Sequence, residues 1–533
     1  MSGPEAVDLL VTGGSVVDGS GEPARAGTVA CLDGRLHLGD AEWRPRAGRT
    51  IDAAGMVVAP GFIDLHSHGG LVILADPRHE PKVRQGVTSE VIGVDGNGYA
   101  PFHRPEDLHA FVDLNAGLDG RPEIAYDWGS VASYVGRYDR GQAVNVAVMI
   151  GNSALRIGAI GWEDAPADER GLANMRAALR EALQEGAFGI SSGLDYPPGA
   201  YASTDELAAL TAEAAKGGGF YHTHVRYALG DRFLDPFREA IEIGRRGEGP
   251  VHLTHFYHRQ THPGGPEELL RLVDDARTAG MDVTFDSYPF EWASTRLLIQ
   301  LPLWVQAGGP APLKQRLADP MVRDRLRDEL AARGAAYTSA AGWADLKLGA
   351  FTRPENMGWE SRTLAEVMDE TGRDAVDSIC DLLLGENLGV AQVSSGPWSE
   401  TLRHFVSHPV GMVGTDSTFL GDKPSPRTYG SFPRILGQFV RDERRLSLEE
   451  AVRKMTGAPA ARLGLTDRGL LRDGFWADLV VFDPARVRSN ATYDQPRQYP
   501  DGIEHVAVNG QLVVDANVHT GALPGRALRR GRP

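Results

Sequence analysis

The chain has 533 residues, with 55 lysines and arginines against 71 aspartates and glutamates, so its formal net charge is −16. This balance argues against nucleic acid or an anionic membrane as a bulk partner, and no uninterrupted apolar run approaches the roughly 20 residues that span a bilayer. Two cysteines, Cys31 and Cys380, fit no disulfide framework, and the first residues carry no signal-peptide pattern. We therefore expect a cytoplasmic enzyme, and the overall charge is still compatible with a locally positive pocket for an acidic small molecule.

Both ends of the chain carry short strand patterns. Residues 7–14 alternate as a strand does, and residues 505–514 form two apolar runs about an Asn-Gly turn, which is typical of a β-hairpin. Two β-rich ends around a long middle segment predict a single small β-sandwich closed by both termini. We assign it residues 1–57 and 465–533.

The middle segment, residues 58–464, alternates apolar runs with helical patterns such as residues 172–184 and 204–215. This alternation predicts βα units and a parallel sheet, and eight such units predict a (β/α)8 barrel, whose active site lies at the carboxyl ends of the strands. The eight predicted strands end at or near His66 and His68, Asp95, Ile150, Ser192, His224, His255, Ser287 and Asp416.

The seventh and eighth predicted strands are too far apart for one helix and a loop. Residues 291–409 therefore form a predicted insertion, which is charge-rich and helically periodic over 312–333. Because segments of this length are usually functional or fold on their own, we expect a lid or side wall over the mouth of the barrel.

Four motifs place imidazoles and a carboxylate at predicted strand ends. His66 and His68 leave the same face of one strand, because strand side chains alternate. His224, His255 and Asp416 end three other strands. Imidazole and carboxylate ligands suit zinc and similar divalent ions, which lower the pKa of a bound water. An aspartate beside that water can accept its proton and later protonate a leaving amine.

Any one of these histidines by itself is more simply explained as a packed or surface residue; the set on four strand ends is what predicts a metal centre. His222 and His252 lie two and three positions earlier in their strands, and we expect them to pack behind the site. The histidines in predicted loops are not expected to be ligands: His258, His262, His404 and His408.

Longer motifs carry a family resemblance. They are residues 60–68 (Pro-Gly-Phe-Ile-Asp-Leu-His-Ser-His), 193–199 (Gly-Leu-Asp-Tyr-Pro-Pro-Gly), 285–289 (Phe-Asp-Ser-Tyr-Pro) and 424–434. Over nearly its whole length the chain resembles the amidohydrolase superfamily, in its D-aminoacylase (N-acyl-D-amino-acid deacylase) branch. The resemblance implies a centre of one or two Zn²⁺ ions, or another divalent metal, with Asp416 as the catalytic residue and these metal ligands: His66, His68, His224 and His255.

Three positions depart from the family pattern. Asp95 stands where the family has a bridging cysteine, Asn152 stands for a histidine and Tyr257 for a lysine. Asp95 can still bind metal as a harder oxygen donor, which leaves the identity and number of the metal ions open. The alternative is that Asp95 is only a turn residue before Gly96.

The resemblance also implies residues that bind the substrate. Tyr196 and Arg427 correspond to positions that hold its carboxylate, a task for which the guanidinium fork is well suited. A loop-stabilising salt bridge is the alternative role for Arg427. Tyr288 is expected at the scissile amide or acyl group, with core packing as its alternative, and Arg259 is a further cation within reach.

The favoured hypothesis is hydrolysis of a linear C–N amide bond, that of an N-acyl-D-amino acid, by metal-activated water with Asp416 as general base and acid. The alternative keeps the metal but acts on a ring, as a hydantoinase-like or lactamase-like cyclic amidase or as a deaminase. A binding protein without activity is disfavoured, since the residues predicted to form the metal centre are all present: His66, His68, His224, His255 and Asp416.

Overall fold

The computed structural model describes residues 4–227, 233–333 and 341–531. Eight strands in chain order run through its middle segment: β8 (Phe62–Asp64), β9 (Val87–Ile92), β10 (Asn145–Val148) continued by β11 (Ile150–Gly151), β12 (Gly189–Gly193), β13 (Phe220–His224), β14 (Val251–Leu253), β15 (Val283–Ser287) and β19 (Gly411–Val413). They pair in parallel as a three-stranded sheet, β8 to β10, and a six-stranded sheet, β11 to β15 followed by β19. The predicted succession of parallel strands is confirmed.

The first and last of these strands lie side by side at their carboxyl ends. Ser67 and Ser417 form a parallel bridge, and the amide of Asp416 donates to the carbonyl of His66 over 2.8 Å. Gly414 permits this approach, because a Cβ there would lie 2.8 Å from the Cβ of His66. Two residues from opposite ends of the middle segment are thereby brought together.

Amphipathic helices follow the strands of the six-stranded sheet: α7 (Glu169–Gln184), α8 (Thr204–Lys216), α9 (Asp235–Gly247) and α10 (Pro266–Thr278). In α8 the side chain of Ser203 caps the first turn, and Leu207, Leu210 and Ala214 recur at helical spacing on the buried face. The helices predicted at 172–184 and 204–215 are therefore present.

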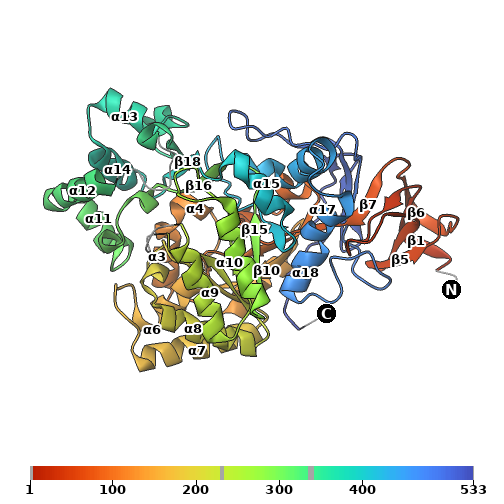
Figure 1. The fold of residues 1–533 in the computed structure, drawn as a ribbon, viewed down its shortest axis with the longest axis horizontal. Helices are drawn as coiled ribbons and strands as arrows, with labels where there is room; N and C mark the ends of the chain where they lie inside the picture. The colour runs from red at the N-terminus through yellow and green to blue at the C-terminus, as the bar shows by residue number, and fades with distance from the viewer. Residues whose placement is uncertain (1–3, 228–232, 334–340, 532–533) are drawn as a thin grey trace.

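The predicted insertion has a sheet and a core of its own. Its antiparallel strands are β16 (Trp292–Arg296), β18 (Ala391–Ser395) and β17 (Lys347–Gly349), in that order. Its helices are α11 (Pro310–Ala318), α12 (Pro320–Arg333), α13 (Leu364–Thr371) and α14 (Ala375–Gly385). They gather at one end of the molecule (Figure 1). The periodic stretch 312–333 is two helices, because Pro320 begins the second.

The end of residues 291–409 does not belong to that separate core. Helix α15 (Ser399–Ser407) lies against α10 and β19, and its buried Leu402 and Phe405 pack into the main core of the parallel-sheet segment. The helical and strand core of the insertion therefore ends with β18.

Both chain ends form sheets at the other end of the molecule (Figure 1). The first sheet contains β5 (Arg35–Gly39), β4 (Thr28–Leu32), β1 (Ala6–Thr12) and β6 (Arg46–Asp52). The second contains β23 (Val518–His519), β22 (Gln511–Asp515), β21 (Ile503–Val508), β20 (Leu479–Phe482), β7 (Val57–Pro60), β2 (Ser15–Val16) and β3 (Arg25–Ala26). Strand β7 pairs antiparallel with β20, and the hairpin about Asn509 and Gly510 is confirmed.

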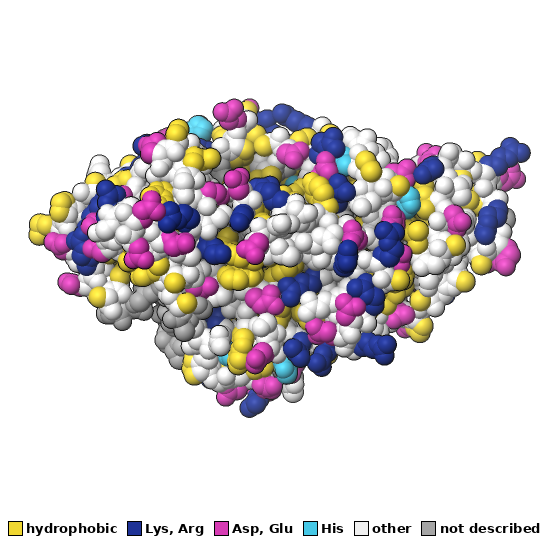
Figure 2. Space-filling view, turned by 90° about the horizontal axis from the view of Figure 1, so that it is seen from above, with side chains coloured by type: hydrophobic (Ala, Val, Ile, Leu, Met, Phe, Trp, Pro, Cys, Tyr) yellow, Lys and Arg dark blue, Asp and Glu magenta, His cyan; other side chains and the backbone are white. Residues whose placement is uncertain are grey.

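The remaining helices are α1 (Gly70–Ala75), α2 (Glu80–Val83), α3 (Pro105–Leu114), α4 (Ala116–Asp119), α5 (Val131–Val135), α6 (Asn152–Ile160), α16 (Arg427–Arg434), α17 (Leu448–Met455) and α18 (Gly457–Leu463). Among the residues described, none of the helices has both the length and the apolar character needed to cross a membrane. Acidic and basic side chains are interspersed over the face seen in Figure 2, so the excess of acid is not gathered into one patch there.

Candidate metal centre

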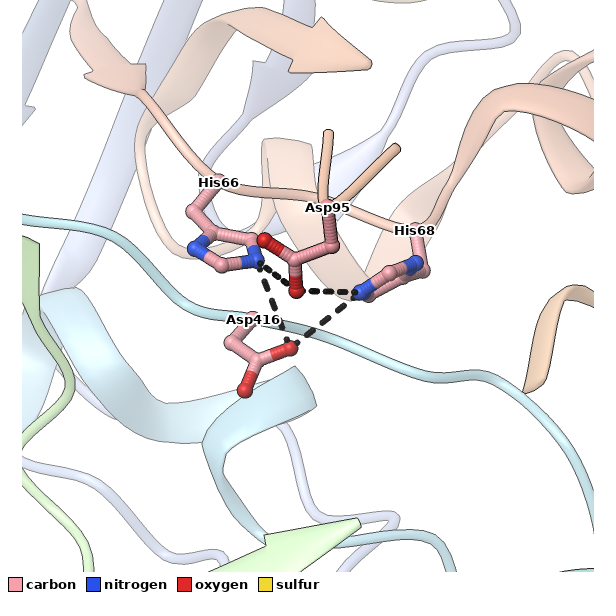
Figure 3. Close-up of side chains that lie close together, drawn as sticks. All are labelled: His66, His68, Asp95 and Asp416. Atoms are coloured by element: carbon pink, nitrogen blue, oxygen red, sulfur yellow. Dashed lines mark hydrogen bonds and ion pairs between the residues drawn. The ribbon is translucent and has the colours of Figure 1, made fainter. Parts of the chain in front are cut away.

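Four predicted residues from three strand ends converge on one point (Figure 3). His66 and His68 follow β8, Asp95 follows β9, and Asp416 follows β19. Oδ2 of Asp95 lies 3.2 Å from Nε2 of His66 and 3.7 Å from Nε2 of His68. Oδ1 of Asp416 lies 3.5 and 3.3 Å from the same two nitrogens. All four side chains are buried, and their donor atoms are close enough together to share one ion.

A second group shares the same aspartate. Nδ1 of His224 and Nε2 of His255 lie 2.9 Å apart, and they lie 3.9 and 3.7 Å from Oδ2 of Asp95. One carboxylate oxygen therefore faces four imidazole nitrogens. Asp95 therefore belongs to two of the three groups of potential ligands in the described part of the chain, the third being His66, His222 and Asp286.

Three of the imidazoles are held from behind by further carboxylates. The pairs are Nδ1 of His66 with Asp286 at 3.5 Å, Nδ1 of His68 with Asp119 at 3.0 Å, and Nε2 of His224 with Asp195 at 3.0 Å. An imidazole that donates its rear N–H to a carboxylate presents the lone pair of its other nitrogen to the centre. This is the arrangement expected of metal-binding histidines, and it fits zinc without any change of side chain.

The carboxylates around His66 and His68 favour a positive charge at the centre. Burial lowers the pKa of His66, but the carboxylates of Asp95, Asp286 and Asp416 outweigh it and raise that pKa to about 10. Burial also lowers the pKa of His68, but hydrogen bonds to Asp119, Asp416 and Asp95 outweigh this effect, so that the pKa of His68 is raised. The carboxylates thus retain protons on buried imidazoles, and a divalent cation supplies the same charge at the same place.

The backbone is strained at three of these residues. Asp95, His255 and Asp416 have φ values of 51°, 34° and 46°, in the left-handed region that non-glycine residues rarely adopt. Such conformations cost of order 1–3 kcal/mol each and persist where surrounding structure enforces them. Each one turns the chain directly after a strand, so that the side chain points into the centre. Three of the candidate ligands therefore have a strained backbone.

His222 and His252 lie behind the centre, as predicted. Their rings stack at 5.2 Å, Nε2 of His222 lies 3.3 Å from the carbonyl of Leu65, and Nε2 of His252 lies 3.0 Å from Asp286. Burial lowers the pKa of both imidazoles and so favours their neutral forms. They support the centre through Asp286 and the strand that carries His66.

A pocket opens beside the centre. Its lining includes Tyr196 and Tyr288, together with Tyr257 and Arg259. The hydroxyl of Tyr196 lies 3.1 Å from that of Thr295, which belongs to β16. Other lining residues of the insertion are Ser294, Gln392 and Ser394. The insertion thus forms one wall of the pocket, which corresponds to the side wall expected from the sequence.

Arg427 occupies a different place from the one its expected role suggests. It is fully buried, and its Nη1 lies 2.8 Å from Oδ2 of Asp416, while its Nη2 donates to the carbonyl of Ser294 over 3.0 Å. It packs over the ring of Tyr288 and stands behind Asp416 rather than among the described lining residues. Burial raises the pKa of Asp416, but Arg427 and His66 hold it below its usual range.

Sequence reasoning missed the carboxylates that hold the imidazoles. Asp195 and Asp286 are buried in the structure, and both lie inside motifs that were recognised for other reasons. Their place in these motifs was the signal that could have found them. Asp119 follows no motif and is brought to His68 only by the fold. Asn152 donates to the carbonyl of Gly199 over 3.0 Å and so supports the loop of Tyr196 instead of entering the centre.

The chain is similar to known proteins over nearly its whole length. The model of the amidohydrolase family matches residues 49–514. An N-acyl-D-aspartate deacylase and a D-aminoacylase, both of Alcaligenes xylosoxydans xylosoxydans, are each 34% identical to the chain over 99% of it, covering 96% and 99% of their own lengths.

Solved structures give the same result. A crystal structure of the N-acyl-D-glutamate deacylase of Bordetella bronchiseptica, complexed with zinc and a phosphonate mimic of the tetrahedral intermediate, is 30% identical with a TM-score of 0.82. It covers 98% of this chain and 100% of its own. A D-hydantoinase structure, at 15% identity and a TM-score of 0.55 over 98% of this chain and 99% of its own, shares the fold alone.

The chain belongs to the amidohydrolase family. Its full-length likeness to several deacylases places it in the D-aminoacylase branch of that family.

Proposed function

We propose that the chain hydrolyses the amide bond of an N-acyl-D-amino acid in a metal-dependent reaction. The observation that carries the proposal is the convergence of four imidazoles on Asp95, with Asp416 beside them and a pocket opening at the same place. Full-length relatives named as deacylases of this type support the substrate class.

The residues present fit one or two zinc ions. One ion would be held by His66, His68, Asp95 and Asp416, and a second by Asp95, His224 and His255; relatives support this number, since D-aminoacylase is described with a binuclear metal centre. Nitrogen and carboxylate oxygen are ligands that zinc accepts. A divalent ion bound there would polarise the acyl carbonyl and lower the pKa of the attacking water toward neutrality.

Within this centre we assign Asp416 the movement of the proton. Arg427 keeps its carboxylate ionised at neutral pH, so that Asp416 is ready to accept the proton of the water. Asp416 then returns this proton to the leaving amine, which departs as the D-amino acid. Because Asp416 Oδ1 lies 3.3 Å from His68 and its Oδ2 is held by Arg427, the carboxylate cannot turn away from the pocket.

We propose that Tyr196 binds the substrate carboxylate together with Arg259, a cation that lines the pocket, and that Tyr288 contacts the scissile amide or the acyl group; Arg427 is the other candidate cation for the carboxylate. Two variants distinguish the roles of Arg259 and Arg427. Arg259→Lys removes the forked donor from the pocket wall and should raise KM about 10-fold with little change in kcat, since a carboxylate bond made by Arg is worth roughly 1.5–3 kcal/mol.

Arg427→Lys should instead lower kcat, because Arg427 holds Asp416. Steady-state kinetics on one N-acyl-D-amino acid measures both variants. A rise in KM confined to Arg427→Lys would assign the substrate carboxylate to Arg427 in place of Arg259.

We further propose that the parallel strands close into a (β/α)8 barrel through the contact between β8 and β19, and that the sheets of the two chain ends pack into one β-sandwich. Support comes from the Ser67–Ser417 bridge and from an apolar cluster that contains Leu9, Val29 and Val481 from both sheets. The proposed domains are 1–57 with 465–533, and 58–464 with its insertion 291–409. A cytoplasmic location remains our proposal.

A substrate panel tests the function. Zinc-supplemented protein is incubated with N-acetyl-D-aspartate, N-acetyl-D-glutamate and N-acetyl-D-leucine, their L enantiomers, a hydantoin, a lactam and an aminated heterocycle. Release of a free D-amino acid from the linear compounds is the expected result. Turnover restricted to the cyclic compounds would replace this proposal with the cyclic amidase or deaminase hypothesis.

A further inference from the structure

We propose that Asp64 and Lys82, a fully buried ion pair outside the candidate ligands, set the distance between the two strand ends that carry His66 and Asp416. They are positioning residues for the metal centre, so the inference rests on the proposed function. Neither residue lines the described pocket, and neither belongs to a group of potential ligands in the described part of the chain.

One side chain ties both strand ends together. Oδ1 of Asp64 accepts the backbone N–H of His66 over 3.1 Å and that of Thr415 over 2.9 Å. Its Oδ2 accepts the hydroxyl of Thr415 over 2.6 Å. His66 precedes His68 by two residues and Thr415 precedes Asp416 by one, so a single carboxylate grips the backbone beside three candidate ligands.

Lys82 makes this arrangement possible. A carboxylate buried without a countercharge would be neutralised or expelled, because desolvation penalises its charge. The ammonium of Lys82 binds Oδ2 of Asp64 and also donates to the hydroxyl of Thr415 over 2.6 Å. Asp64, Lys82 and Thr415 all have no exposed surface. Three groups from β8, α2 and the turn after β19 therefore form one closed network.

The network acts where the two strands meet. The amide of Asp416 donates to the carbonyl of His66, and the amide of His68 donates to the carbonyl of Ser417 over 3.1 Å. Asp416 also has the strained φ of 46°, which would relax if its strand end were released. Movement of one strand end relative to the other would separate the imidazoles from Asp416, and metal affinity depends on ligand distances held within a few tenths of an ångström.

The chain contains a matched control on the same strand. Lys454 is also buried, with 1% of its surface exposed, and it donates to the carbonyls of His408 and Gly411 at the amino end of β19. Lys82 and Lys454 are thus two buried lysines that hold opposite ends of one strand. Only Lys82 lies at the end that carries Asp416.

The experiment compares Lys82→Met with Lys454→Met in the full chain. The protein is stripped with a chelator, and the Kd for Zn²⁺ is measured by competition with a chromophoric chelator, with Tm recorded for the metal-free protein. Both variants should lower Tm, because each loses a buried ammonium that satisfies backbone or carboxylate oxygens. Lys82→Met should weaken zinc binding roughly 10- to 100-fold, while Lys454→Met should leave it within about twofold.

Equal zinc affinities in the two lysine variants, with wild-type protein binding zinc, would overturn the positioning role and leave the proposed function intact. Absence of zinc binding by wild-type protein would overturn both. If Lys82→Met does not fold, Thr415→Val and Thr415→Ser replace it. The valine removes the hydroxyl of the network and should weaken zinc binding, and the serine should restore it; equal affinities for these two would also overturn the proposal.

Discussion

Two layers of histidines at the carboxyl ends of the parallel strands are both buried, but they differ in the carboxylates that face them. The outer layer contains His66, His68, His224 and His255, and the inner layer contains His222 and His252; all six are buried. Burial lowers the pKa of the inner pair and of His255 in the outer layer, whereas nearby carboxylates raise the pKa of His66 to about 10 and that of His68 above its usual range. For His66 and His68 the carboxylates outweigh burial.

This difference separates a cation site from its support. Asp95 and Asp416 face the outer layer from the front, and Asp119, Asp195 and Asp286 hold three of its rings from behind. The inner layer has Asp286 alone, which His252 shares with His66. More carboxylates face the outer layer than the inner one, and this favours a divalent ion at the outer layer.

The largest effect is expected from Asp416→Asn, which removes the proton carrier of the outer layer while keeping its shape. His66, His68 and Asp95 stay in place as candidate ligands, so bound zinc should be retained. Turnover of the best N-acyl-D-amino acid should fall about 10²- to 10⁴-fold, the usual contribution of general acid–base catalysis. Single-turnover kinetics together with elemental analysis measure both properties, and near-normal turnover would reject the role of Asp416.

Next in size is a contrast between the layers on one strand. His255→Asn removes a candidate ligand from the outer layer, and His252→Asn removes an inner ring three residues earlier that binds Asp286 and Thr284. Loss of a residue that only supports a metal ligand weakens metal binding roughly 10- to 100-fold. His255→Asn should weaken zinc binding by more than this range, and His252→Asn by no more than it.

Chelator competition gives the two dissociation constants, and thermal unfolding reports the separate cost in stability. The same loss of affinity in both variants would show that the layers do not differ in function.

The smallest expected effect is on the way in which the stability of the metal-free protein depends on pH. The folded-state pKa of His66, about 10, lies above its ordinary value of 6.5, so His66 stabilises the fold fully below pH 6.5 and loses this contribution as pH rises through 10. The lowered pKa of His252 works in the opposite direction, since protonation of the unfolded chain below pH 6.5 removes stability as pH falls.

Denaturant titrations of metal-free protein between pH 5 and pH 10 measure both limbs. His66→Asn should flatten the alkaline limb, and His252→Asn the acidic limb. Excess zinc should also flatten the alkaline limb, because it replaces the proton on His66. An unchanged alkaline limb in His66→Asn would contradict the raised pKa.

The sequence determined the strands, the hairpin about Asn509 and Gly510, and the candidate ligands, because each depends on local patterns: period-two alternation, turn residues, and histidine or aspartate at the end of an apolar run. It also indicated Asp95, which ends a predicted strand at the place where the resembled family has a cysteine. Family membership followed from motifs that extend over a few residues each.

The tertiary structure alone decided which groups meet. The pairing of Arg427 with Asp416, the support of His68 by Asp119, and the bond of Lys82 to Asp64 join residues from different elements. None of these contacts leaves a periodic signal, since a buried charge has no preferred spacing to its partner along the chain. Their geometry follows only when the last parallel strand is brought beside the first, and this is why the sequence alone does not show that Arg427 pairs with Asp416.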